Sequence, residues 1–100
     1  AGRCLARIAH ANDRILVHEF RLTAQERVDF ALLDHKGGVL LVEVKVKGSL
    51  SDLTRQVFRY ADHPDVKGLL VLTTRAAHGG LPAEVMGKPL AVLCLAEYLL

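Results

Sequence analysis

The sequence is poor in cysteine, aromatic residues and long apolar runs, and each shortage excludes a class of protein. Its 100 residues include two cysteines, no tryptophan and 5% aromatic residues. Cys4 and Cys94 are too few for a disulfide framework and show no zinc-type spacing, which favours a reduced, cytoplasmic setting. Apolar runs such as Val39–Val42 and Leu69–Leu72 fall far short of the roughly 20 residues that cross a bilayer. We therefore expect no transmembrane helix, signal peptide or membrane partner.

Charge and short motifs also give little direct guidance. The formal net charge of +2 is too small to indicate a polyanion partner by itself, although it does not oppose one. The turn Lys36-Gly37-Gly38 lacks the spacing of a phosphate-binding P-loop. The five histidines show no metal-ligand spacing, and His78, in a glycine-rich loop, is expected to be exposed. The placement of charge along the predicted elements is therefore the better guide to function.

The composition of the chain and the periodicity of its apolar residues indicate one folded α/β domain over residues 1–100. Hydrophobic residues make up 51% of the chain and the mean hydropathy is +0.25, which is enough to fill a core. Periodicity and turn residues predict these elements in chain order: a helix over 1–11, strands over 14–22, 27–33 and 39–47, a helix from 49–52 to 61, a strand over 66–74, a helical turn over 82–86, a strand over 89–94 and a helix that begins at 95. This αβββαβ order predicts a mixed central sheet flanked by helices on both faces.

The most informative segment is Glu43-Val44-Lys45, which follows the apolar run Val39–Val42 on a strand that otherwise has the composition of a buried one. Because side chains two apart on a strand point to the same face, Glu43 and Lys45 are expected side by side over one surface of the sheet. An unpaired charge there would cost several kcal/mol, so each needs a partner, a metal ion or water. A Glu-x-Lys pair on a strand is thus a candidate functional site.

The preceding hairpin adds a third residue to this pair. A turn with an odd number of residues at Gly37-Gly38 places Asp29 opposite Glu43. The other face of the hairpin is then wholly apolar, with these opposed pairs: Val28 with Val44, Phe30 with Val42 and Leu32 with Leu40. A slip of one residue would destroy both patterns. Opposed Cβ atoms lie about 5 Å apart, a separation at which two carboxylates can share a divalent cation.

Two carboxylates beside a lysine suit phosphodiester hydrolysis. Oxygen ligands hold Mg²⁺, which keeps some of its waters, lowers their pKa and neutralises charge on a phosphate. Lys45 would then position or help to deprotonate the attacking water, and stabilise the negative charge that develops. We therefore expect Asp29 and Glu43 to bind Mg²⁺, with Mn²⁺ as a substitute, and Lys45 to be catalytic.

Asp29, the glycine turn and Glu43-x-Lys45 together resemble the PD-(D/E)xK nuclease superfamily, whose restriction-endonuclease-like fold has the core order αβββαβ. Gln56 and Tyr60, four residues apart on the next predicted helix, resemble the Gln-x-x-x-Tyr element of its RecB-like branch. The short chain is also similar to small resolvase-like members. This resemblance implies that Gln56 and Tyr60 support a catalytic site formed by the other three residues.

The chain departs from the family pattern in two places. Val28 stands where many members have proline, a common and tolerated change. Many members also supply an acidic residue or a histidine from the first helix as a further metal ligand. The candidates here are His10, in the predicted first helix, and Glu19, on the first predicted strand.

Four arginines are candidates for contacts with a nucleic-acid backbone. Arg55 and Arg59 share one face of the predicted helix, Arg27 lies on the same strand side as Asp29, and Arg75 follows a strand end. Together with the resemblance to PD-(D/E)xK nucleases, these arginines predict an endo- or exonuclease that acts on duplex, branched or single-stranded DNA. Two alternatives stay open: a catalytically silent nucleic-acid-binding or assembly module on the same scaffold, and an RNA-directed nuclease. Double-strand cleavage would need a homodimer, for which residues 95–100 offer an apolar interface.

Overall fold

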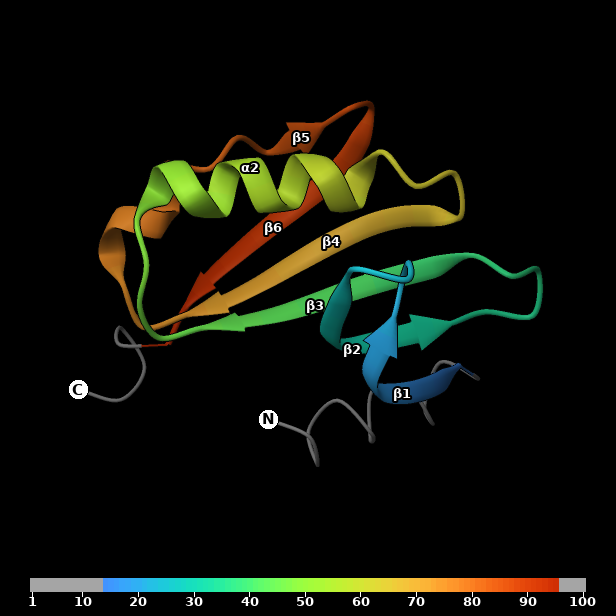
Figure 1. Ribbon diagram of the computed structural model, residues 1–100. Coiled ribbons are helices and arrows are strands. Elements are labelled where there is room, and N and C mark those ends of the chain that lie inside the picture. The colour runs from blue at the N-terminus through green and yellow to red at the C-terminus, as the bar shows by residue number, and fades with distance from the viewer. Residues whose placement is uncertain (1–13, 96–100) are drawn as a thin grey trace.

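The computed structural model describes residues 14–95 (Figure 1). In chain order its elements are β1 (Ile15–Arg21), β2 (Arg27–Leu33), β3 (Val39–Lys45), α2 (Leu50–Ala61), β4 (Val66–Thr73), the 3₁₀ helix η1 (Ala76–Gly80), β5 (Glu84–Val85) and β6 (Lys88–Cys94). The helix predicted over 1–11 and most of the helix predicted from 95 fall outside the described residues. Among the helices of residues 14–95, none is long and apolar enough to cross a membrane.

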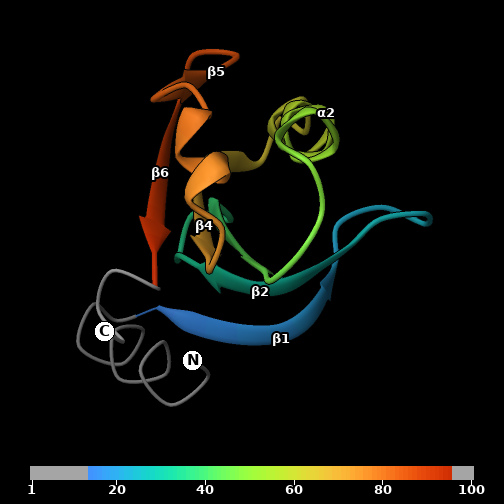
Figure 2. The same cartoon turned by 90° about the vertical axis from the view of Figure 1, so that its left-hand side faces the viewer.

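The strands form a mixed sheet in the order β1-β2-β3-β4-β6-β5. β1, β2 and β3 are antiparallel neighbours, whereas β3 pairs with β4, and β4 with β6, in parallel. Helix α2 makes the crossover from β3 to β4 and covers one face of the sheet (Figures 1 and 2). The prediction of an α/β domain with a mixed sheet is confirmed. The predicted helix on the second face falls on residues outside the described range.

Turn and cap residues explain where the central elements begin. Ser49 caps α2, because its hydroxyl oxygen accepts the N–H of Asp52 at 3.0 Å. Between β2 and β3, Asp34 Oδ1 accepts two backbone N–H groups of the turn, including that of Gly38, at 2.8 Å. These bonds hold the pKa of Asp34 below its usual range. The hairpin is thus specified locally, which helps to fix the register of β2 against β3.

The core lies mainly between α2 and the sheet. Leu53 and Val57 of α2 pack with Leu41 of β3 and with other buried residues of the neighbouring strands. A smaller cluster around Val42 packs on the opposite face. Because side chains alternate along β3, Glu43 lies on the same sheet face as Leu41, under α2. The fold therefore directs Glu43 towards the helix that carries the other candidate residues.

Strand β2 bends near Asp29, so that Val28 does not share a face with Phe30 as predicted. Val28 is fully buried in the cluster under α2, whereas Phe30 packs in the cluster on the opposite face. Across from this bend, Glu19 of β1 has a φ of 53°, and its pairing with β2 is interrupted. A positive φ at a non-glycine strand residue redirects the strand, and the ends of β1 and β2 curl towards α2 (Figure 2).

Residues 82–86 do not form the predicted helical turn. Val85 of β5 pairs with Lys88 of β6, and the two residues between them make a tight hairpin. Met86 and Gly87 have φ values of 51° and 77°. Two consecutive positive φ angles are typical of a two-residue hairpin turn and are incompatible with a helix. The turn at residues 86 and 87 therefore decides the conformation of this segment.

Candidate functional site

The two candidate carboxyl groups lie where the β2–β3 ladder ends. The predicted register is confirmed by the pairing of Phe30 with Val42. Beyond this pair, side chains replace the backbone ladder: the N–H of Val44 donates to Asp29 Oδ2 at 2.8 Å, and the N–H of Asp29 donates to Glu43 Oε1 at 3.3 Å. Each carboxyl group therefore accepts a donor from the neighbouring strand, and both are held together at the point where the strands separate.

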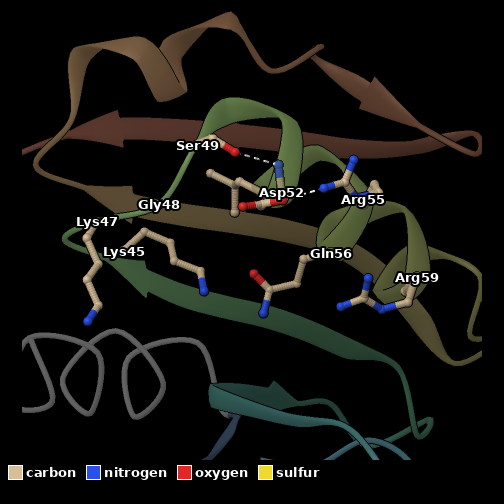
Figure 3. A pocket seen from close by; sticks show the side chains of 9 residues that line it. Lys45, Lys47, Gly48, Ser49, Asp52, Arg55, Gln56 and Arg59 are labelled. Carbon is tan, nitrogen blue, oxygen red and sulfur yellow. Dashed lines mark hydrogen bonds and ion pairs between the residues drawn. The ribbon is translucent and has the colours of Figure 1, made fainter.

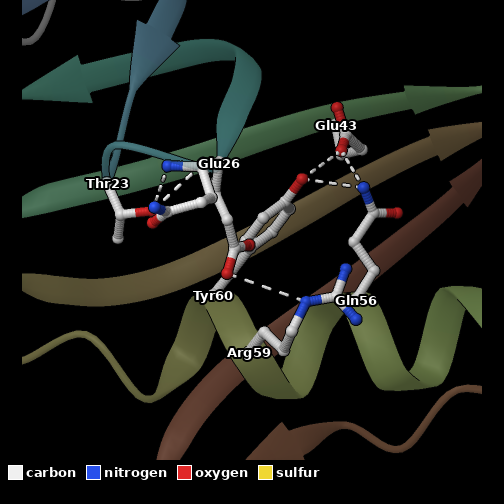
Figure 4. Close-up of polar contacts among 7 residues, drawn as sticks. Thr23, Glu26, Glu43, Gln56, Arg59 and Tyr60 are labelled. Atoms are coloured by element: carbon white, nitrogen blue, oxygen red, sulfur yellow. Dashed lines mark hydrogen bonds and ion pairs between the residues drawn. The ribbon is translucent and has the colours of Figure 1, made fainter.

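Helix α2 brings two further side chains to Glu43 (Figure 4). Gln56 and Tyr60 are one helical turn apart, and both face the sheet. Gln56 Nε2 lies 2.9 Å from Glu43 Oε2, and the Tyr60 hydroxyl lies 3.0 Å from the same oxygen. Gln56 Nε2 also donates to the Tyr60 hydroxyl at 2.7 Å. Because Glu43 is 6% exposed and Tyr60 is 3% exposed, these bonds satisfy a carboxyl group that water hardly reaches.

Burial makes Glu43 an unusual acid. Its pKa is raised to about 7, first by burial and then by the neighbouring Asp29 carboxyl group. The hydrogen bond from Tyr60 and the charge of Lys45 oppose this rise in pKa. Burial, followed by the charge of Glu43, also raises the pKa of Tyr60 well above its usual range, so its hydroxyl remains a donor. Glu43 therefore carries a poorly solvated charge above neutral pH, which a cation beside Asp29 would stabilise.

The substitution Tyr60→Phe is expected to destabilise the protein more at pH 8 than at pH 5. The variant loses the donor that lowers the pKa of Glu43, so the ionised carboxylate is less well satisfied. We expect the free energy of unfolding to fall by about 1–2 kcal/mol at pH 8, and by less at pH 5, where Glu43 is protonated. Urea denaturation at both pH values tests this, with Phe58→Leu on the exposed side of α2 as the control. Equal losses at both pH values would contradict it.

A basic cleft opens between the end of β3 and helix α2 (Figure 3). Its volume is about 290 Å³, and four basic side chains and one acidic side chain contribute to its lining, which comprises Lys45, Lys47, Gly48, Ser49, Asp52, Leu53, Arg55, Gln56 and Arg59. The cleft adjoins the carboxyl pair of Asp29 and Glu43, because Gln56 lines the cleft and also donates a hydrogen bond to Glu43. The excess of positive charge suits a ligand that carries phosphate groups.

The four arginines predicted to contact phosphates separate into two pairs. Arg55 and Arg59 line the cleft, as predicted from their shared helix face. Arg27, at the start of β2, and Arg75, just before η1, are exposed and do not line it. Both cleft arginines have acidic neighbours: Arg55 pairs with the aspartate one turn earlier, and Arg59 Nε lies 3.7 Å from Glu26 Oε1. The Arg55 pair is exposed on both sides and therefore weak, so a phosphate can replace its carboxylate.

The further metal ligand expected from the family resemblance is not found in the described residues. His10 lies outside them. Glu19 is exposed on β1 and has no hydrogen bond or ion pair with Asp29 or Glu43. Within residues 14–95, no group of three or more His, Cys, Asp or Glu side chains is placed to hold a metal ion. The carboxyl groups of Asp29 and Glu43 are therefore the candidate ligands that this part of the chain brings together.

One buried polar residue was mispredicted from the sequence. His78, expected to be exposed, is fully buried in η1, with Nδ1 at 2.6 Å from Thr73 Oγ1 and Nε2 at 2.9 Å from the Gly48 carbonyl oxygen. A histidine between two alanines and two glycines has no apolar pattern that indicates burial. Its partners come from β4 and from the β3–α2 connection, so its burial follows from tertiary contacts.

Comparisons with known proteins support the fold and say nothing of an activity. No family model and no protein with a curated description matches the chain. Among solved structures, the SPO1766 protein of unknown function from Silicibacter pomeroyi is similar, with 25% sequence identity and a TM-score of 0.59. The similarity covers 84% of this chain and 57% of that protein, so the chain spans little more than half of its length.

Proposed function

We propose that this chain is a Mg²⁺-dependent nuclease of the PD-(D/E)xK type, with a restriction-endonuclease-like fold, that hydrolyses phosphodiester bonds of DNA. One observation carries the proposal: Glu43 accepts hydrogen bonds from Gln56 and Tyr60 while it lies against Asp29, beside a cationic cleft that includes Lys45. A structural role alone explains this poorly, because burying the Glu43 carboxyl group beside a second, half-buried carboxyl group is costly for the fold.

The carboxyl groups of Asp29 and Glu43 fit a hard divalent cation. Of the two Asp29 oxygens, Oδ2 accepts one backbone N–H, and Glu43 Oε1 accepts one long hydrogen bond, at 3.3 Å, so both groups retain lone pairs. Mg²⁺ sites commonly use one or two carboxylates, several waters and the substrate phosphate, so the donor set suffices. When bound here, the ion would supply a water of lowered pKa and neutralise charge on the phosphate.

The other candidate residues would orient the substrate and the carboxylate. Lys45 lies at the end of β3 and lines the cleft, from which its ammonium group would orient the attacking water and stabilise the charge on the phosphate. Gln56 and Tyr60 would hold one oxygen of Glu43, leaving the other for the ion. Arg55 and Arg59 would bind phosphates of the flanking backbone.

Cleavage of labelled nucleic acids tests the proposal. We expect single-stranded, duplex or four-way DNA to be cut with Mg²⁺ or Mn²⁺ and to remain intact in EDTA. The same preparation of Asp29→Ala should not cut. DNA binding without cleavage would favour a catalytically silent binding or assembly module, and cleavage of RNA alone would identify an RNA-directed nuclease. Cleavage that persists in Asp29→Ala would assign the activity to another site or to a contaminant.

Arg59→Ala is expected to weaken DNA binding and its dependence on salt, whereas Arg75→Ala is the matched control. Arg59 lines the cleft and Arg75 does not. Loss of one phosphate contact should raise the Kd several-fold and reduce the slope of log K against log salt by about 1. Fluorescence anisotropy with a labelled duplex in EDTA, at several salt concentrations, measures both quantities. Equal effects of the two substitutions would contradict the proposal that DNA binds at the cleft.

A further inference from the structure

Two buried polar side chains outside the carboxyl pair form a second network beside the cleft. Among residues 14–95, the buried polar residues are Glu43, Thr73 and His78, and the last two are 0% exposed. Thr73 ends β4, directly opposite Lys45 in the parallel β3–β4 ladder. His78 lies in η1, which follows a short loop after β4. The network therefore lies at the end of β3 on its β4 side, whereas Asp29 lies on its β2 side.

The partners of His78 define its tautomer. The Gly48 carbonyl oxygen, 2.9 Å from Nε2, can only accept, so Nε2 carries a hydrogen. Nδ1 lies 2.6 Å from Thr73 Oγ1, and that oxygen accepts the N–H of Arg75 at 3.0 Å. If the Thr73 hydroxyl donates to Nδ1, a neutral ring satisfies every polar atom of the network.

The atom that His78 holds belongs to the wall of the cleft. Gly48 has a φ of 102° and lies in the connection between β3 and the N-cap of α2, where it lines the cleft with Lys47 and Ser49. Glycine leaves this connection conformationally free, so an external contact is needed to hold it in one position. Its carbonyl oxygen receives that contact from His78. The same 3₁₀ helix packs closely against the first turn of α2, because a Cβ added at Gly80 would lie 2.8 Å from Leu50 Cδ2.

We propose that His78, oriented by Thr73, is a positioning residue that fixes the β3–α2 connection and thereby the shape of the basic cleft. Neither side chain contacts the substrate; both act through the backbone at Gly48. The role of the cleft rests on the proposed nuclease function. We call the hydrogen bonds from Thr73 to His78 and from His78 to the Gly48 carbonyl oxygen the clamp. The clamp is a property of the free protein and can be tested without a substrate.

Thr73→Val and Thr73→Ser form a matched pair for this test. Valine keeps the shape and branching of threonine but removes the hydroxyl group, whereas serine keeps the hydroxyl group. In the free protein, the N–H groups of Asp52 and Leu53 bond to Ser49, which follows Gly48. We expect their hydrogen exchange to become about tenfold faster in Thr73→Val, and to stay near wild type in Thr73→Ser, with the β1–β2 ladder unchanged in both.

Kinetics separate positioning from a general loss of structure. Thr73→Val should raise the KM for DNA about fivefold and leave kcat within about twofold, because the β3–α2 connection that it loosens carries no residue with a role in the chemical step. A merely structural role would lower the active fraction, and hence kcat, at unchanged KM. Thr73→Ser should restore the wild-type KM. A lowered kcat with unchanged KM in Thr73→Val would overturn the positioning role.

Different results would contradict the clamp and the proposed nuclease function. Nitrogen NMR of the wild-type protein should show a hydrogen on Nε2 of His78, a measurement that does not depend on whether Thr73→Val folds. A tautomer without a hydrogen on Nε2, or unchanged exchange at Asp52 and Leu53 in Thr73→Val, would overturn the clamp whatever the cleavage assay gives. Wild-type protein that does not cut DNA would overturn the nuclease proposal, while the tautomer and exchange results would still decide the clamp.

Discussion

Glu43→Gln is expected to abolish DNA cleavage and, at the same time, to stabilise the protein above neutral pH. Glutamine has nearly the same shape and keeps an oxygen that can accept from Gln56 and Tyr60. It cannot supply the negative charge that a divalent cation requires of its ligand. We therefore expect cleavage to fall by at least about a hundredfold. The two effects have opposite signs because the charge that the activity requires is costly for the fold.

The direction of the stability effect follows from the raised pKa of Glu43. A carboxyl group whose pKa is about 7 in the folded protein, and 4.5 in the unfolded chain, binds its proton more tightly when the protein is folded. Its contribution to stability is complete below the unfolded pKa and is lost as the pH rises through 7. Glutamine remains neutral and avoids this loss. The variant should gain about 1–3 kcal/mol in the free energy of unfolding at pH 8, and nothing at pH 4.

Thermal unfolding across this pH range measures the gain. With roughly 4–8 °C per kcal/mol for a domain of this size, the Tm of Glu43→Gln should exceed that of wild type by several degrees at pH 8 in EDTA. The exposed Glu84→Gln removes the same charge from the surface and should leave the Tm unchanged. A Glu43→Gln variant that is less stable than wild type at pH 8 would contradict the account of the buried carboxylate.

Lys45→Ala is expected to stop cleavage while the fold is kept. The Lys45 side chain is half-buried at the cleft, and its charge lowers the pKa of Glu43. Its removal takes away the cation that would orient the water and stabilise the developing charge, which should lower kcat by at least about a hundredfold. Because the charge of Lys45 opposes the rise in the pKa of Glu43, a small loss of stability is expected at pH 8 and none at pH 4.

Lys47→Ala is the matched control for Lys45→Ala. Lys47 also lines the cleft, but it lies beyond the end of β3 and has no assigned role in the chemical step. Its removal should raise the KM for DNA several-fold at unchanged kcat, as expected for a residue that contributes only binding. Single-turnover rates with saturating duplex separate the two variants. A large loss of kcat in both, or in neither, would contradict the role given to Lys45.

Alternation along two strands was sufficient to predict much of the candidate site. The turn at Asp34 and the apolar residues of β2 and β3 fix one register, and this register alone brings Asp29 to Glu43. Lys45 follows because side chains two apart share a face. That Gln56 and Tyr60 support the site was suggested by family resemblance only, and their contacts with Glu43 were not predicted. Their spacing shows that they share a helix face, but the rotation of α2 over the sheet depends on how the whole core packs.

The features that escaped sequence reasoning depend on contacts between distant segments. His78 is buried because Gly48, 30 residues earlier, presents a carbonyl oxygen to it. The bend near Asp29 accompanies a left-handed residue, Glu19, on the neighbouring strand, which no local pattern indicates. The tight turn at Met86 requires a conformation that methionine rarely adopts. In each case tertiary structure overrides a weak local preference.

The rate of duplex cleavage as a function of Mg²⁺ concentration, for wild type and Asp29→Asn purified in parallel, tests the central claim most directly. Asparagine keeps an oxygen that can accept the N–H of Val44 and removes the charge beside Glu43. We predict a wild-type rate that rises with Mg²⁺ to a plateau and vanishes in EDTA, and a rate for Asp29→Asn that stays at background throughout. Equal rates for the two proteins, or a wild-type rate that does not depend on Mg²⁺, would contradict a metal-dependent nuclease centre at Asp29 and Glu43.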